Sequence, residues 1–157
     1  AVLQLSFIAG GMWAVWQSRP IAVVYAAGSY ATTNRHGYEM EKIRPETVAA
    51  LDAHWPVWLA VKLPAGSERS ISAVWALMGS GLQYNVENYV PYHEVTADLA
   101  TSGLKASDIK DAKQDLQAVE KNAATEIRFF PITTSMYEGY LSVETGTGKV
   151  LDFFELS

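Results

Sequence analysis

The chain of 157 residues contains no cysteine, which excludes disulfide bonds, thiolate metal sites and cysteine nucleophiles. A chain without cysteine suits oxidising and reducing compartments equally, so this absence leaves the location open. Positive charge is also scarce, because twelve Lys and Arg residues face seventeen Asp and Glu residues, for a net charge of −5 at pH 7. Since no basic surface predominates, the sequence predicts no nucleic-acid partner. Its hydrophobic content of 49% is enough for a buried core and excludes disorder over most of the chain.

Recognisable catalytic and metal-binding motifs are missing as well. The histidines His36, His54 and His93 lie far apart, without the spacing of metal ligands. The sequence has no nucleotide-binding glycine loop and no nucleophile elbow. Glu94 and Asp98 are four residues apart, and carboxylates at this spacing on a surface helix are usually solvated rather than an acid–base pair. The sequence therefore predicts no enzyme, no catalytic residue, no metal and no cofactor.

Charge is absent from residues 1–16, the most apolar stretch of the chain. As a helix this stretch spans roughly 24 Å, which is short of the roughly 20 residues needed to cross a bilayer. Its end is typical of a membrane exit: Trp13 and Trp16 suit the interfacial belt, Arg19 can reach the headgroups, and Pro20 stops the helix. We interpret this stretch as the tail of a transmembrane helix. The alternative is an amphipathic or core helix of a soluble protein.

Three small residues recur every four positions within this stretch, namely Ser6, Gly10 and Ala14. A stripe of small residues lets a second helix approach closely in lipid. The stripe is therefore a candidate helix-packing face for a partner.

After Pro20 the pattern changes to that of a soluble domain, with β-branched runs, alternating strands and helical periodicity. We expect residues 34–37 to form a loop and residues 145–148 to form a hairpin turn. Strands are predicted at 21–25, 30–33, 57–63, 82–86, 126–132, 137–144 and 149–156, and helices at 46–53, after Ser67, at 96–101 and at 107–123. The predicted fold class is α+β: an N-terminal hydrophobic helix followed by a single domain with a mostly antiparallel sheet packed by two or three helices. The predicted boundaries are residues 1–19 for the hydrophobic, transmembrane-derived helix and 20–157 for the domain.

Residues 3–25, LQLSFIAGGMWAVWQSRPIAVVY, carry a family resemblance. They resemble the type IV pilin accessory proteins of the TfpX/TfpZ group, in which the last transmembrane helix ends in a polar pair, then Arg-Pro and a strand. Later features follow the order of that family: the strand ending in Leu63-Pro64, the helix after it, the step at Pro91-Tyr92 and the hairpin before Val150.

This resemblance implies an inner-membrane protein with further transmembrane helices upstream and with residues 20–157 in the periplasm. The implied role is that of a non-enzymatic chaperone or assembly factor, and the implied partner is the cognate major type IV pilin. Two contact surfaces are expected, the stripe of small residues and an exposed aromatic or strand edge of the domain. The helices of two copies are also expected to be able to cover each other in a homodimer.

Two other functions remain open from the residues. A membrane-anchored sensor or small-ligand-binding domain would show convergent polar groups within an apolar pocket. A regulatory domain similar to PepSY domains is suggested by residues 144–150, which form a short glycine-containing hairpin.

Overall fold

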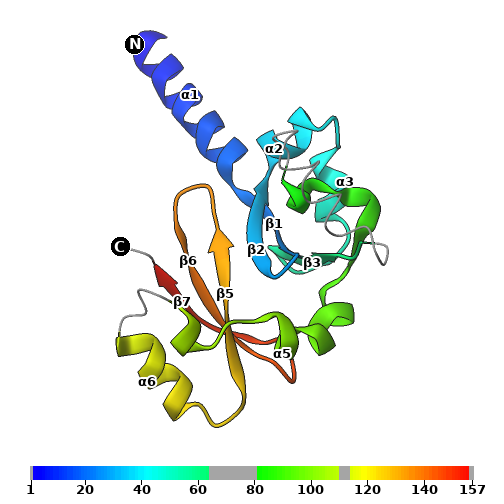
Figure 1. Ribbon diagram of the computed structural model, residues 1–157. Helices are drawn as coiled ribbons and strands as arrows, with labels where there is room; N and C mark the ends of the chain where they lie inside the picture. Colours follow the sequence, from blue (N-terminus) through cyan, green and yellow to red (C-terminus); the bar gives the residue numbers. More distant parts are fainter. Residues whose placement is uncertain (1, 64–80, 110–113, 156–157) are drawn as a thin grey trace.

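The computed structural model describes residues 2–63, 81–109 and 114–155. Helix α1 (Val2–Ser18) projects from the domain, as Figure 1 shows in dark blue. It ends where Pro20, which lacks an N–H group for the helical ladder, opens strand β1 (Pro20–Ala26). Within the described ranges, the chain has no helix that combines the length and the apolar character needed to cross a membrane.

The domain is built on one mixed sheet, in the order β4-β3-β1-β2-β5-β6-β7. Two of its neighbouring pairs, β1 with β3 and β2 with β5, are parallel, and the other pairs are antiparallel. Besides β1, the strands are β2 (Ser29–Asn34), β3 (Val57–Val61), β4 (Tyr89–Pro91), β5 (Ile127–Thr133), β6 (Glu138–Glu144) and β7 (Val150–Glu155).

The predicted fold class, an N-terminal hydrophobic helix with a mostly antiparallel sheet packed by two or three helices, is therefore wrong. The seven strands dominate, the helices of the domain are few and short, and the sheet is mixed. Parallel pairs need crossover connections, and here the chain passes through α2 (Arg35–Met40) and α3 (Pro45–Ala49) before β3 returns beside β1. Such a return depends on distant segments, so no local pattern in the sequence indicated it.

Two other local predictions are wrong. Residues 34–37 form no loop: Asn34 ends β2 and residues 35–37 begin α2. The Asn34 side chain accepts a hydrogen bond from the Gly37 N–H group at 2.8 Å and caps the helix. Residues 82–86 fall in two 3₁₀ turns, η1 (Leu82–Tyr84) and η2 (Val86–Asn88), rather than in a strand. The ring of Tyr84 packs edge-on against Tyr38, with 5.1 Å between the ring centroids.

The strands predicted near β1, β2, β3, β5, β6 and β7 are confirmed, with shifted ends. The predicted helices are shorter than expected or divided. Residues 46–53 give only α3, residues 96–101 fall in η3 (Tyr92–Asp98) and α5 (Leu99–Ser102), and residues 107–123 contain η4 (Ala106–Asp108) and α6 (Gln114–Asn122). The helix predicted after Ser67 lies outside the described residues.

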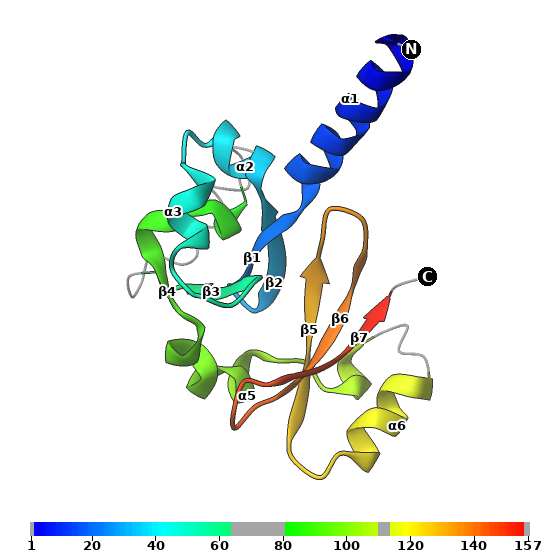
Figure 2. The same cartoon turned by 180° about the vertical axis from the view of Figure 1, so that it is seen from behind.

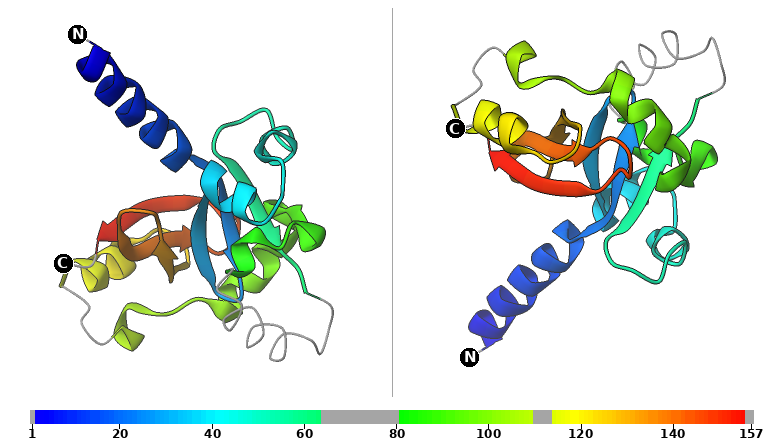
Figure 3. Two further views of the ribbon diagram at one scale, coloured as in Figure 1. Left: turned by 90° about the horizontal axis from the view of Figure 1, so that it is seen from above. Right: turned by 90° about the horizontal axis from the view of Figure 1, so that it is seen from below.

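The sheet has a hydrophobic cluster on each face, because successive side chains of a strand point to opposite sides. Along β1, Val23 and Tyr25 join the cluster of Leu99 on one face, whereas Ala22 and Val24 belong to the other. A third cluster joins α6 to the sheet around Phe129 and Leu116. Figures 2 and 3 show α2 and α3 beside β1–β3, and α6 beside the other half of the sheet.

Each face also holds a series of hydrogen-bonded tyrosine hydroxyl groups that are partly or fully buried. On the first face the Tyr92 O–H group donates to the Gly148 carbonyl oxygen at 3.0 Å, so the Tyr30 O–H group donates to the Tyr92 oxygen at 2.5 Å. On the second face Tyr89 donates to the Gln83 carbonyl oxygen, and Tyr38 therefore donates to Tyr89 at 2.8 Å. Both series end on a backbone carbonyl group, which fixes the direction of their hydrogen bonds.

Candidate functional site

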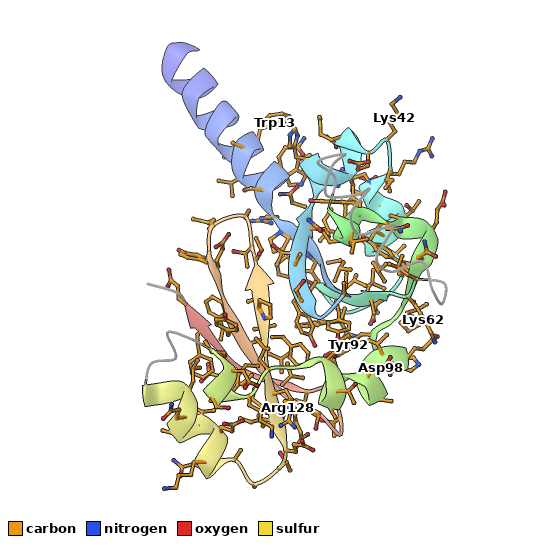
Figure 4. All side chains as sticks on the ribbon, in the orientation of Figure 1. Trp13, Lys42, Lys62, Tyr92, Asp98 and Arg128 are labelled. Atoms are coloured by element: carbon orange, nitrogen blue, oxygen red, sulfur yellow. The ribbon has the colours of Figure 1, made fainter. Side chains whose placement is uncertain are left out.

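The base of α1, where the helix meets the domain, contains the residues expected at a membrane interface. Trp13 is 62% exposed and Trp16 is 46% exposed, and Arg19 is exposed between α1 and β1. Trp13 is labelled on α1 in Figure 4. Every residue from Gly10 to Trp16 is exposed, so this half of the helix presents apolar side chains on all sides.

Trp16 is held by Arg35, the first residue of α2. The guanidinium carbon of Arg35 lies 3.9 Å from the centroid of the Trp16 ring, a cation–π contact worth roughly 0.5–1 kcal/mol at an exposed site. The same guanidinium group lies 2.6 Å from the Glu46 carboxylate and 3.8 Å from the Glu39 carboxylate. Its hydrogen bond lowers the pKa of Glu46. Arg35 therefore joins the last turn of α1 to both α2 and α3.

Gln17 makes a second attachment between the helix and the domain. Its side chain is buried, and its amide nitrogen donates to a carboxylate oxygen of Glu39 at 3.3 Å. Gln17 is the one buried residue between Gly10 and Arg19. The last turn of α1 is fixed on α2 by a partly buried polar contact and a stacked ring.

A pocket of about 210 Å³ lies between this last turn and the helices α2 and α3. It brings Trp55, which is 66% exposed, close to Trp16 and Arg19, although Trp55 is distant from both in the sequence. The residues that line it are Trp16, Arg19, Pro20, Ile21, Arg35, Pro45, Glu46, Ala49 and Trp55. The sequence analysis missed Arg35 and Trp55, since no periodic or motif signal connects them to α1.

The stripe of small residues lies along α1. Gly10 and Ala14 are exposed, and a Cβ atom added at Gly10 would meet no atom within 4 Å in the described part of the protein. Ser6 lies one turn earlier on α1, and its side chain is outside the part that the structure describes. No described segment of the domain covers Gly10 or Ala14, so this face is open to a partner. Gly11 is equally open but points to another side of the helix.

A larger cavity, of about 680 Å³, lies at the end of β1 beside the helices η3 and α5. Its walls combine apolar side chains with a few polar groups, an arrangement typical of small-molecule sites. The lining residues are Tyr25, Ala27, Gly28, Val61, Lys62, Leu63, Val95, Asp98 and Ser102. Figure 4 labels the oppositely charged Lys62 and Asp98 in this part of the domain.

The polar groups of this cavity are joined by hydrogen bonds. The Ser102 hydroxyl group donates to the Asp98 carbonyl oxygen at 2.8 Å, so the Tyr25 hydroxyl group donates to Ser102 at 2.7 Å. Burial raises the pKa of Tyr25, which stays protonated at neutral pH. Ser102 has no base to activate it among the described residues, and the described His, Asp and Glu side chains form no group that could hold a metal ion.

Strand β7 forms one edge of the sheet, and Leu151 and Phe153 on it are 47% and 40% exposed. The Asp152 carboxylate accepts a hydrogen bond from the Phe153 N–H group at 2.8 Å. A negative charge placed on the backbone in this way disfavours pairing with another strand.

No family model, no curated protein and no solved structure matches this chain.

Proposed function

We propose that this protein is a non-enzymatic accessory or chaperone protein for type IV pilin stability and pilus assembly. In this proposal α1 lies in the inner membrane, residues 20–157 lie in the periplasm, and the partner is the cognate major pilin. The observation that carries the proposal is the projecting helix, which is uncharged, exposed on all sides from Gly10 to Trp16, and fixed to the domain by Gln17 and Arg35.

The shape of the protein suits a partner that has both an apolar helix and a folded head. In lipid, helices associate through close packing at small residues, because the surrounding chains are as apolar as the helices themselves. Gly10 and Ala14 offer such a face, and α1 carries no charge that lipid would disfavour. A small additional contact with the domain would keep the complex reversible, as delivery of the pilin requires.

Co-purification with the pilin tests this proposal, and the chain offers a matched control. Gly10→Leu places a bulky side chain on the stripe of small residues, whereas Gly11→Leu makes the same change on another side of the helix. We expect Gly10→Leu to lower both the recovery of pilin and piliation, and Gly11→Leu to leave them unchanged. Neither variant should change the unfolding midpoint of the domain, because neither Cβ atom meets another atom within 4 Å.

Full pilin recovery with Gly10→Leu would show that the stripe of small residues is no contact. An equal loss with both variants would show that α1 is needed only as an apolar anchor. In either case any specific recognition of the pilin would have to come from the domain.

A second candidate function, a membrane-anchored sensor or small-ligand-binding domain, is favoured by the cavity of about 680 Å³. Native mass spectrometry of the purified protein would detect a retained small molecule. Asp98→Asn should weaken its retention, whereas Glu94→Gln, which alters an exposed carboxylate of the same helix η3, should not. Absence of any retained molecule, together with the pilin result expected above, would favour the accessory role.

A further inference from the structure

Several large apolar side chains of the domain are strongly exposed near the base of α1. Met40, at the end of α2, is 70% exposed, and Trp55 is 66% exposed. Met136 and Tyr137, in the connection between β5 and β6, are 77% and 46% exposed. Single exposed apolar residues are common on protein surfaces, whereas several on one side of a molecule indicate a contact surface.

Their elements all lie at the end of the domain from which α1 leaves. Trp55 lines the same pocket as Trp16 and Arg19. Met40 ends α2, the helix whose Arg35 and Glu39 hold α1. The connection between β5 and β6 points to this end in the opposite views of Figures 1 and 2, whereas the connection between β6 and β7 lies at the other end.

The connection between β5 and β6 is a tight turn rather than a loose loop. The Thr134 hydroxyl oxygen accepts hydrogen bonds from the N–H groups of Met136 at 3.2 Å and Tyr137 at 2.8 Å. The Thr134 N–H group donates to the Tyr137 carbonyl oxygen at 2.8 Å. The turn therefore holds Met136 outward although no described residue covers it.

We propose that this end of the domain rests on the membrane surface, with Trp55 and the turn at Met136 inserted at the level of the lipid headgroups. The inference rests on the proposed function, because it requires α1 to lie in lipid. Met40, Trp55, Met136 and Tyr137, which belong to the elements at this end of the domain, are here called the collar. The collar adds contacts with the bilayer to the attachments of α1 by Arg35 and Gln17, and so helps to hold the domain at one tilt over the membrane.

Lipid is the occupant that fits the collar because of its position and its chemistry. A membrane that encloses α1 ends at the base of the helix, where the collar lies. Trp and Tyr are the side chains enriched at this depth, since their rings combine an apolar body with a polar group. Met and Trp also bury apolar area in the interface, which is the main source of binding for surface anchors.

The charges near the collar indicate that apolar insertion, rather than attraction to anionic lipid, dominates the contact. Arg35 is paired with Glu39 and Glu46. Over residues 19–55, which include Met40 and Trp55, four positive side chains are matched by four carboxylates, namely Arg19, Arg35, Lys42 and Arg44 against Glu39, Glu41, Glu46 and Asp52. The whole chain carries a net charge of −5. Binding of the collar to phosphatidylcholine should therefore resist high salt.

Site-directed labelling can test the contact, because the chain has no cysteine of its own. Single variants Trp55→Cys, Met136→Cys, Val15→Cys and Leu151→Cys each receive an environment-sensitive fluorophore. The full chain is then placed in phosphatidylcholine nanodiscs that carry quenchers at the headgroup level or in the acyl chains. Val15 reports on α1, and Leu151, which is 47% exposed and follows the connection between β6 and β7, is the matched control at the other end.

We expect the labels at positions 55 and 136 to shift to shorter wavelength and to lose emission to headgroup quenchers, both in low and in high salt. The label at position 15, between Trp13 and Trp16, should also be quenched at the headgroup level, and the label at 151 by neither quencher. Quenching at 15 without quenching at 55 and 136 would overturn the collar and leave the proposed function standing. No quenching at 15 would overturn the membrane part of the proposed function itself.

Other occupants of the collar would give different results. If the lipid quenchers leave the emission of the labels at positions 55 and 136 unchanged, but their emission wavelength shifts when pilin is added, the collar is a protein contact and the proposal is wrong. If the emission wavelength shifts only as the concentration of this protein rises, the collar binds a second copy of the protein. If high salt abolishes the quenching by lipid, the collar is held at the membrane by charge attraction. Each of these results contradicts apolar insertion.

Discussion

The hydrogen bonds that run from Tyr30 through Tyr92 to the Gly148 carbonyl group predict that Tyr92→Phe lowers the free energy of unfolding more than Tyr30→Phe does. Tyr92 belongs to η3, which also supplies Val95 and Asp98 to the larger cavity, so these hydrogen bonds hold one wall of that cavity in place. The Tyr30 side chain is 1% exposed and Gly148 is buried. Water therefore cannot easily replace a lost partner at either end of this series.

Tyr30→Phe removes the first donor and leaves Tyr92 still bonded to Gly148. Its expected cost is that of one ordinary hydrogen bond, about 1 kcal/mol. Tyr92→Phe instead leaves two buried groups unpaired, the Tyr30 hydroxyl group and the Gly148 carbonyl group. At about 1–3 kcal/mol for each of the two unpaired groups, we expect a cost of roughly 2–6 kcal/mol.

The double variant shows whether the two hydrogen bonds depend on each other, through the sign of the change that Tyr30→Phe makes to the free energy of unfolding of Tyr92→Phe. Tyr30→Phe in the Tyr92→Phe background removes a hydroxyl group that has already lost its acceptor, so it should restore part of the stability. The double variant should therefore be more stable than Tyr92→Phe alone, by about 1 kcal/mol. Urea unfolding of the full chain in detergent, followed by tyrosine and tryptophan fluorescence, measures the three free energies. Additive losses would refute the directed series of hydrogen bonds.

Further predictions concern the turns and the buried tyrosines. Gly139→Ala should destabilise the domain by about 1–3 kcal/mol, because its Cβ atom would collide with a backbone oxygen of β7, whereas Gly146→Ala, in open space, should be neutral in thermal unfolding. Asn34→Ala should cost about 1 kcal/mol in urea unfolding by removing the cap of α2. Burial raises the pKa of Tyr30 and Tyr38 above the ordinary value of 10.0, so the folded state binds more protons than the unfolded state at alkaline pH. Stability should hold below pH 10 and fall as the pH rises above it, and urea midpoints that stay constant into the alkaline range would contradict the burial.

The hairpin of β1 and β2 shows what the sequence could predict. The run IAVVY alternates between the two faces of the sheet, and its turn falls at Ala27 and Gly28, both with positive φ. Such signals are local, because the residues that turn the chain adjoin the residues that pair. The cap at Asn34 was equally local, and three positions separate it from Gly37, so it could have been identified.

The parallel strand pairs of the mixed sheet and the contacts at the base of α1 could not be predicted from such local signals. Pairing of β1 with β3 depends on how α2 and α3 pack, and Arg35 meets Trp16 only after that packing. The larger cavity likewise joins Tyr25, Val61 and Ser102 from three separate segments. The spacing of residues in the sequence does not predict contacts of this kind, because the segments that form them are distant in the sequence and share no periodic pattern.

The attachment of α1 bears on any function that couples a helix to a domain. Only Arg19 separates the end of α1 at Ser18 from the start of β1 at Pro20, a central strand of the sheet. Proline restricts its own φ and the backbone of the residue before it, so this junction has little freedom. The contacts of Arg35 and Gln17 act on the last turn of the helix from α2. A force or a partner that tilts α1 must therefore move the sheet as well, and the domain's orientation follows from that of the helix.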